Sequence, residues 1–97
     1  PHAPRKFTRP ELVAQVRQAL QNVMAVLAEA GAGGPHITRM TWYLTDKREY
    51  LAAGPAIGQA FRELIGHYDI AMTAVQVVAL IEERAKVEIE VTAVVPD

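Results

Sequence analysis

The chain has 97 residues, a formal net charge of −1 at pH 7 and neither cysteine nor serine. This length suits one domain, and 51% apolar with 22% charged residues is typical of a globular protein. The near-neutral charge gives no long-range attraction to nucleic acid or to an anionic membrane, and no apolar run approaches the roughly 18–20 residues of a membrane span. The missing cysteine and serine exclude disulfides and the nucleophiles of most hydrolase triads.

We expect a single domain over residues 1–97, with residues 1–7 as a tail and a first helix from about Thr8 to Ala30. Thr8 and Glu11 have the spacing of a capping box, and Pro10 falls in the first turn, where its missing N–H costs nothing. Gly31 ends the predicted helix. Apolar residues recur at helical spacing on one face, at Leu12, Val16, Leu20, Val23 and Leu27.

A strand is predicted at His36–Thr45, because its side chains alternate in character between two faces. One face carries Met40, Trp42 and Leu44, and the other carries Arg39, Thr41 and Tyr43. A second helix follows. Asp46 and Glu49 form its capping box, and a break is expected at Gly54-Pro55.

Two β-rich runs, Ala71–Leu80 and Lys86–Val95, end the predicted order α-β-α-β-β. The connection between them is short, so we expect the two strands to be antiparallel neighbours. Glu88 and Glu90 share one face of the second run with Thr92 and Val94, while Val87, Ile89, Val91, Ala93 and Val95 form the other. A face that mixes acidic and apolar residues indicates a subunit interface that contains a cleft.

Two helices cover only one face of such a sheet, so the other face is expected to be open. Depending on the register, it would carry Arg39, Thr41, Tyr43, Ala74, Val78 or Val94. Apolar positions on an open face favour association, because large exposed apolar patches are uncommon on monomers. We therefore expect an oligomer.

Three segments together resemble the RidA/YjgF family of imine and enamine deaminases, from about Phe7 onward. They are VRQALQNVMAVLAEAGA, TRMTWYLTDKREYLAA and MTAVQVVALIEERAKVEIEVTAVV. The resemblance implies an α+β fold of the chorismate-mutase-like type, with an antiparallel or mixed sheet and two helices on one face. It also implies a trimer with ligand clefts between subunits. Family members carry an N-terminal β-hairpin before this point, so we expect either a missing segment or a trimmed domain.

Glu88 matches the family glutamate that positions the water attacking the imine carbon. A carboxylate suits this task, because it accepts a proton from water and passes it to the departing nitrogen. The alternative is an acidic residue at a strand edge or interface, paired with arginine or lysine. Glu90 is interpreted as structural.

The sequence Ile70-Ala71-Met72-Thr73 stands where family deaminases have Pro-Ala-Arg-Ser/Thr. Arginine holds a substrate carboxylate with two charge-assisted hydrogen bonds, worth about 1.5–3 kcal/mol, and Met72 offers neither charge nor donor. Arg39 and Arg84 are possible substitutes, although the sequence places neither one there. The resemblance implies ligand contacts at Met72, Thr73 and Ala74, in a pocket less polar than the family's, with Gly54 and Ile57 at two further cleft positions.

The sequence thus predicts a RidA-like oligomer that acts on a small reactive metabolite, with imine or enamine hydrolysis as the reaction. The alternatives are a non-catalytic trimer that binds a small, mostly apolar ligand, and an interaction module that assembles with a partner. We expect no cofactor, no nucleic-acid or membrane partner, and a cytoplasmic location. We expect no metal site either, because His2, His36 and His67 lack ligand spacing.

Overall fold

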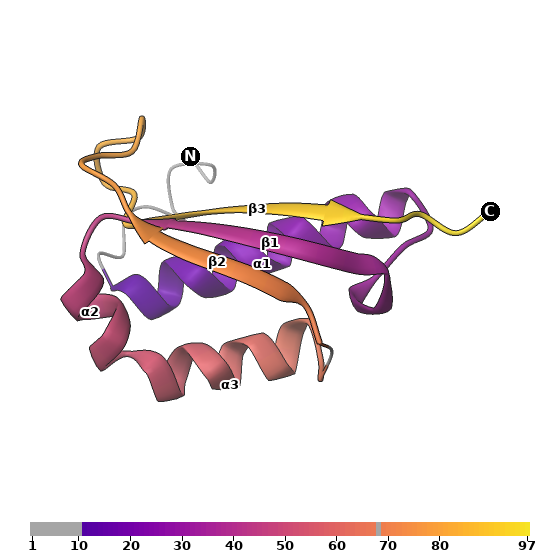
Figure 1. Cartoon of the computed structure of the whole chain (residues 1–97), viewed down its shortest axis with the longest axis horizontal. Helices are drawn as coiled ribbons and strands as arrows, with labels where there is room; N and C mark the ends of the chain where they lie inside the picture. The colour runs from indigo at the N-terminus through magenta and orange to yellow at the C-terminus, as the bar shows by residue number, and fades with distance from the viewer. Residues whose placement is uncertain (1–10, 68) are drawn as a thin grey trace.

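The computed structural model describes residues 11–67 and 69–97. Figure 1 shows a small sheet with its helices on one side. The elements in chain order are helix α1 (Leu12–Glu29), a 3-10 turn (Gly34–His36), strand β1 (Ile37–Leu44), helices α2 (Lys47–Ala52) and α3 (Gly54–Leu64), and strands β2 (Ala71–Gln76) and β3 (Val87–Ala93). The expectation of an α+β fold is confirmed.

The three strands form one mixed sheet in the order β2-β1-β3, with β1 parallel to β2 and antiparallel to β3. The prediction that the last two strands are neighbours was wrong, because β1 lies between them (Figure 1). Both strands are shorter than predicted, so residues 77–86 form a connection long enough to pass the end of β1. There Val77 N donates to Leu44 O at 2.8 Å, and Thr45 N donates to Lys86 O at 3.1 Å.

Helix α1 starts later than predicted. Glu11 is its N-cap and has extended backbone angles (φ −70°, ψ 130°), so it lies before the helix and not in its first turn. Thr8 and Pro10 lie outside the described residues. The predicted end at Gly31 is confirmed, because Gly31 has a positive φ of 73° and the following Ala32 N donates to Leu27 O at 2.8 Å.

The second helical region is divided as predicted. Asp46 Oδ1 accepts hydrogen bonds from Arg48 N at 2.9 Å and Glu49 N at 3.1 Å, which confirms Asp46 as an N-cap. α2 ends at Ala52 and α3 begins at Gly54, so the predicted break is also confirmed. The Glu49 carboxylate accepts from Lys86 Nζ at 2.9 and 3.0 Å, which ties α2 to the start of β3.

The core lies between the helices and the sheet, where Trp42, Leu20, Met40 and Val16 are the largest fully buried side chains. One buried polar side chain links α1 to the segment before β3. Gln15 Nε2 donates to Arg84 O at 2.9 Å, and Gln15 Oε1 accepts from Lys86 N at 2.7 Å. Its amide therefore satisfies two backbone groups at the point where the chain enters the sheet.

The predicted faces of β1 and β3 are confirmed. Met40, Trp42 and Leu44 are buried, whereas Arg39 is exposed and Thr41 and Tyr43 are half-buried. Ala74 was expected as a possible open-face residue, but this placement was wrong. It pairs with Trp42 in the parallel register, so both side chains face the helices. On β2 the open face is formed instead by Ala71, Thr73 and Val75.

Candidate functional site

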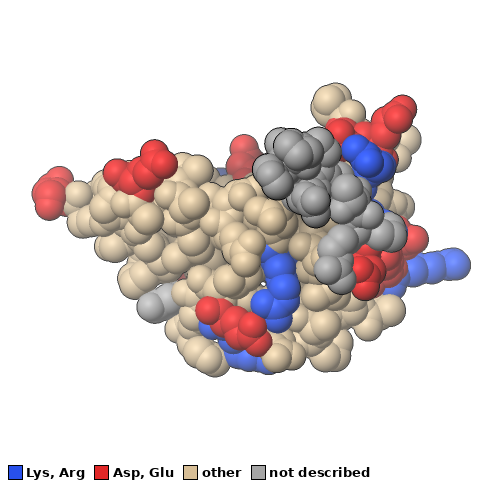
Figure 2. Space-filling model, turned by 180° about the vertical axis from the view of Figure 1, so that it is seen from behind, with Lys and Arg blue, Asp and Glu red and all other residues tan. Residues whose placement is uncertain are grey.

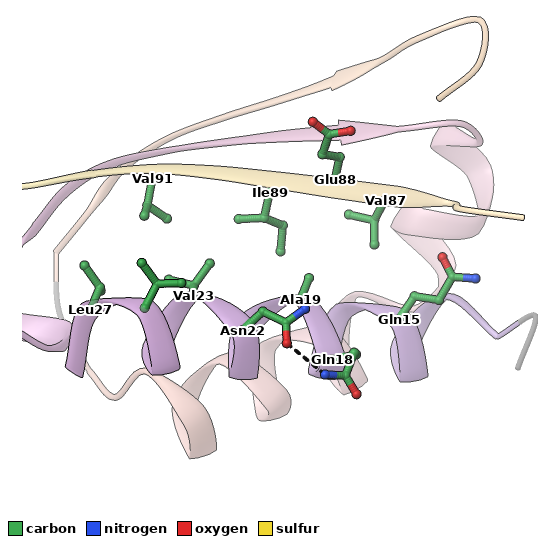
Figure 3. Close-up of a pocket in the computed structure, with 11 residues that line it drawn as sticks. Gln15, Gln18, Ala19, Asn22, Val23, Leu27, Val87, Glu88, Ile89 and Val91 are labelled. Atoms are coloured by element: carbon green, nitrogen blue, oxygen red, sulfur yellow. Dashed lines mark hydrogen bonds between the residues drawn. The ribbon is translucent and has the colours of Figure 1, made fainter. Parts of the chain in front are cut away.

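Glu88 lies on the open face of the sheet, opposite Tyr43 on the neighbouring strand β1. In Figure 3 its carboxylate points away from α1, while Val87, Ile89 and Val91 point toward that helix. No arginine or lysine of the described residues forms an ion pair with Glu88. The carboxylate is therefore available to a ligand or a second copy.

Glu90 has a partner on the same face. Tyr43 Oη donates to Glu90 Oε1 at 3.3 Å. The pKa of Tyr43 is raised above its usual 10.0, chiefly because the negative charge of Glu90 opposes ionisation of the phenol. Partial desolvation, the hydrogen bond to Glu90 and the charge of Glu88 act in the same direction. The two glutamates of β3 therefore differ in their surroundings, which the alternation alone did not reveal.

Met72 lies on the opposite face, next to Met40 in the parallel register. It lines a pocket of about 520 Å³ between α2, α3 and the strands β1 and β2. Gly54 and Ile57, the other two positions expected in one cleft, line the same pocket. The remaining wall is mostly apolar and includes Trp42, Leu51 and Phe61.

The predicted site residues are thus divided between the two faces of the sheet. Glu88 and Thr73 lie on the open face, and Met72 and Ala74 lie on the helix face. The sheet itself separates Glu88 from Met72. A single copy of the chain cannot bring both side chains to one small ligand.

Arg62 also lines the pocket beside Met72, and sequence reasoning missed it. Its guanidinium Nη1 lies 3.2 Å from the position that a Cβ on Gly58 would occupy. The available signal was the i, i+4 spacing of Gly58 and Arg62 on one helix, which places them on the same face. The cations named from sequence lie elsewhere, since Arg39 is on the open face and Arg84 is in the connection before β3.

A second hollow of about 350 Å³ lies between α1 and β3 (Figure 3). Its walls are mainly apolar, with Val23 and Leu27 on the helix and Ile89 and Val91 on the strand. Gln18 Nε2 donates to Asn22 Oδ1 at 2.9 Å on the helix that forms one wall. Among the described residues, the outer edge of β3 has no partner strand.

Charged residues of both signs are interspersed on the face seen in Figure 2, with wide uncharged areas between them. Within residues 11–67 and 69–97, no group of three or more potential metal-ligating side chains is found. None of the helices in these ranges combines the length and the apolar character needed to cross a bilayer.

The sheet order and the helices on one face define an α+β protein with a single mixed sheet, and known proteins share this arrangement. The sequence pattern of the family described as "Endoribonuclease L-PSP" matches residues 2–95. A RutC family protein of Synechocystis is 35% identical over 82 residues, which are 84% of this chain and 60% of that protein. The chain therefore belongs to the L-PSP family, which includes the RidA and YjgF proteins.

Two solved structures illustrate the similarity. E. coli TdcF, crystallised with bound serine, is 33% identical with a TM-score of 0.73, and the match covers 84% of this chain and 63% of TdcF. RidA from an Antarctic Psychrobacter is 28% identical with a TM-score of 0.72, over 89% of this chain and 67% of that one. The chain spans 60% of the length of the curated relatives it matches.

Proposed function

We propose that this protein hydrolyses an imine or enamine of a small metabolite at a site shared between two copies of the chain. One copy contributes the pocket that contains Met72, and another contributes Glu88. The proposal rests on the separation of Met72 and Glu88 by the sheet, because only a second copy can add the Glu88 carboxylate to the pocket. The family resemblance supports a trimer as the assembly.

In the proposed reaction, Glu88 accepts a proton from water as the water oxygen bonds to the imine carbon. That proton then passes to the nitrogen, which gives a carbinolamine; an enamine reaches the same point after tautomerising to the imine. The hydroxyl proton of the carbinolamine next moves to the amino nitrogen, the C–N bond breaks as the C=O bond forms, and ammonia leaves a carbonyl product. Glu88 suits this role because no cation of the described residues pairs with it. The serine bound to TdcF, a relative, supports a small metabolite as the ligand.

Ammonia release from 2-aminoacrylate, generated in situ and compared with its spontaneous hydrolysis, tests the reaction. We expect Glu88→Gln to reduce the acceleration by roughly a hundredfold or more, the usual contribution of a general acid–base group. Glu90→Gln is the matched control on the same strand face and should retain activity. If folded and oligomeric wild-type protein gives no acceleration, 2-aminoacrylate hydrolysis is not its reaction.

A complementation experiment tests the shared site. Glu88→Gln removes the carboxylate, and Met72→Trp fills the pocket, so each variant should be inactive alone. When the two are unfolded and reassembled together, some clefts combine an intact pocket with an intact Glu88, and part of the activity should return. If verified mixed oligomers recover no activity, the site is not built from two copies.

The mostly apolar wall beside Met72 favours a second candidate, a trimer that binds a small ligand without converting it. In that case, ligand binding should be saturable and should survive Glu88→Gln. Equilibrium binding measured on both proteins separates the two functions, because a catalytic site also shows turnover.

A further inference from the structure

We propose that Tyr43 belongs to the reaction site, and that its hydroxyl oxygen holds the attacking water together with the carboxylate of Glu88. The copy that supplies Glu88 thus supplies the complete nucleophile, and the other copy supplies the pocket for the imine. This inference deepens the proposed function and rests on it. The alternation of side chains placed Tyr43 on the open face of the sheet but gave it no role there.

A hollow on the open face lies beside Tyr43 and Glu88. Its volume is about 420 Å³, and Leu80, Ile89 and Glu90 form the rest of its lining. Several waters fit in this space, since each takes up about 30 Å³ in the liquid. Tyr43 on β1 and Glu88 on β3 are direct partners in the antiparallel register, so their side chains leave the sheet side by side on one face. A water in the hollow can therefore contact both side chains.

The hydrogen bond between Tyr43 and Glu90 leaves the phenol oxygen free to bind water as an acceptor. An ionised carboxylate only accepts hydrogen bonds, so the Tyr43 hydroxyl donates its hydrogen to Glu90 Oε1, at 3.3 Å. The pKa of Tyr43 is raised, chiefly by the charge of Glu90, so the hydroxyl keeps this hydrogen at neutral pH. Glutamine at position 90 retains an oxygen acceptor, so the control variant Glu90→Gln keeps the hydroxyl in the same direction.

Two acceptors on one side of a water orient its reactive oxygen. The water donates one hydrogen to Glu88 and the other to Tyr43, so a lone pair of its oxygen is directed away from the sheet and toward the second copy. Glu88 removes the first hydrogen as a proton while the bond from oxygen to the imine carbon forms. The second hydrogen stays on the oxygen and becomes the hydroxyl hydrogen of the carbinolamine. Tyr43 therefore neither gains nor loses a proton in this step.

The first test removes the hydroxyl and keeps the aromatic ring. In folded and oligomeric Tyr43→Phe, we expect kcat for 2-aminoacrylate hydrolysis to fall roughly tenfold, the upper end for a neutral hydrogen bond. KM should change little, because Tyr43 contacts the water and not the imine. Thr41→Val is the matched control, since Thr41 carries a hydroxyl on the same face of β1 but does not line the hollow. It should leave kcat unchanged.

Mixed oligomers show which copy supplies Tyr43. When a Met72→Trp chain is combined with a Glu88→Gln chain, each active cleft takes Glu88 from the first chain and the pocket from the second. Tyr43→Phe added to the Met72→Trp chain should lower the recovered activity roughly tenfold. The same substitution added to the Glu88→Gln chain should leave the recovered activity unchanged. A substitution that only loosens the fold would lower the activity of both mixtures.

Wild-type kcat in Tyr43→Phe, an equal loss in Thr41→Val, a change confined to KM, or recovered activity that does not differ between the two mixtures would each overturn the proposal. Glu88→Gln separates this inference from the proposed function. If Glu88→Gln is inactive while Tyr43→Phe is as active as the wild type, the reaction stands and the role of Tyr43 fails. If the wild type gives no acceleration, the reaction fails, and the role of Tyr43 fails with it.

Discussion

The hydroxyl of Tyr43 donates a hydrogen bond to Glu90, two residues along β3 from Glu88. Tyr43 faces Glu88 directly across the strand pair, yet its hydroxyl contacts the diagonal neighbour. One glutamate of the open face is therefore held by a neighbouring side chain, and the other has no such contact among the described residues. This difference supports the chemical role that we propose for Glu88.

The Tyr43–Glu90 pair predicts a measurable pH dependence. Since the folded state raises the pKa of Tyr43 above 10.0, its contribution to stability is fully present below that value and is lost as pH rises through the folded-state pKa. The difference in phenolate absorbance between wild type and Tyr43→Phe should give a pKa above 10.0. In Glu90→Gln this pKa should move back toward the usual value. An unchanged pKa in Glu90→Gln would show that the carboxylate is not its cause.

Gln15 should be important for stability although it is polar. Its side chain is 3% exposed and satisfies the backbone carbonyl of Arg84 and the backbone N–H of Lys86. Gln15→Ala should lower the free energy of unfolding by about 1–3 kcal/mol, because these groups lose their partner. Chemical denaturation measures the change. Gln18→Ala is the control, because Gln18 lies one helical turn further along α1 and is only half-buried. It should lower stability by less, and equal losses in the two variants would contradict the role of Gln15.

Gly58→Ala should stabilise the protein. Alanine favours a helix over glycine by roughly 0.8–1 kcal/mol, and the new Cβ meets only the flexible end of Arg62. We expect the free energy of unfolding to rise by up to about 1 kcal/mol. Chemical denaturation measures the change. A loss of stability would show that the guanidinium of Arg62 cannot move away from the new Cβ.

The open face should be the surface through which copies associate. Val75 lies on this face and is 39% exposed, in the row that also contains Tyr43 and Glu88. Val75→Lys should weaken association, because an unpaired charge would have to be removed from water in the interface. Sedimentation velocity measures the mass of the assembly. Gln21→Lys, an exposed substitution on α1, adds the same charge elsewhere and should leave the mass unchanged.

Local sequence patterns were sufficient to predict the side-chain directions in the strands and one helix cap. Alternation along the strands predicted correctly that Trp42 faces the core and Glu88 does not, because side-chain direction in a strand is a local property. Asp46 was also predicted, since an N-cap depends on residues next to it. The family resemblance correctly identified the fold.

The order of the strands and the composition of the pocket are not local properties. The pairing of the last two strands was predicted from the length of their connection, but both edges of β1 form backbone hydrogen bonds, so β1 separates them. The face of Ala74 depends on this register. Arg62 reaches the pocket because α3 lies across it from β1 and β2, which no spacing within the strands could indicate.

The central position of β1 leaves β2 and β3 each with an outer edge that has no strand beside it among the described residues. Such edges are templates on which further copies can add in an uncontrolled way, and charged side chains are one of the means by which proteins prevent this. We expect the acidic pair of β3, Glu88 and Glu90, to have a protective effect that is independent of any reaction. Like charges at these positions disfavour the edge-to-edge pairing of one β3 with another.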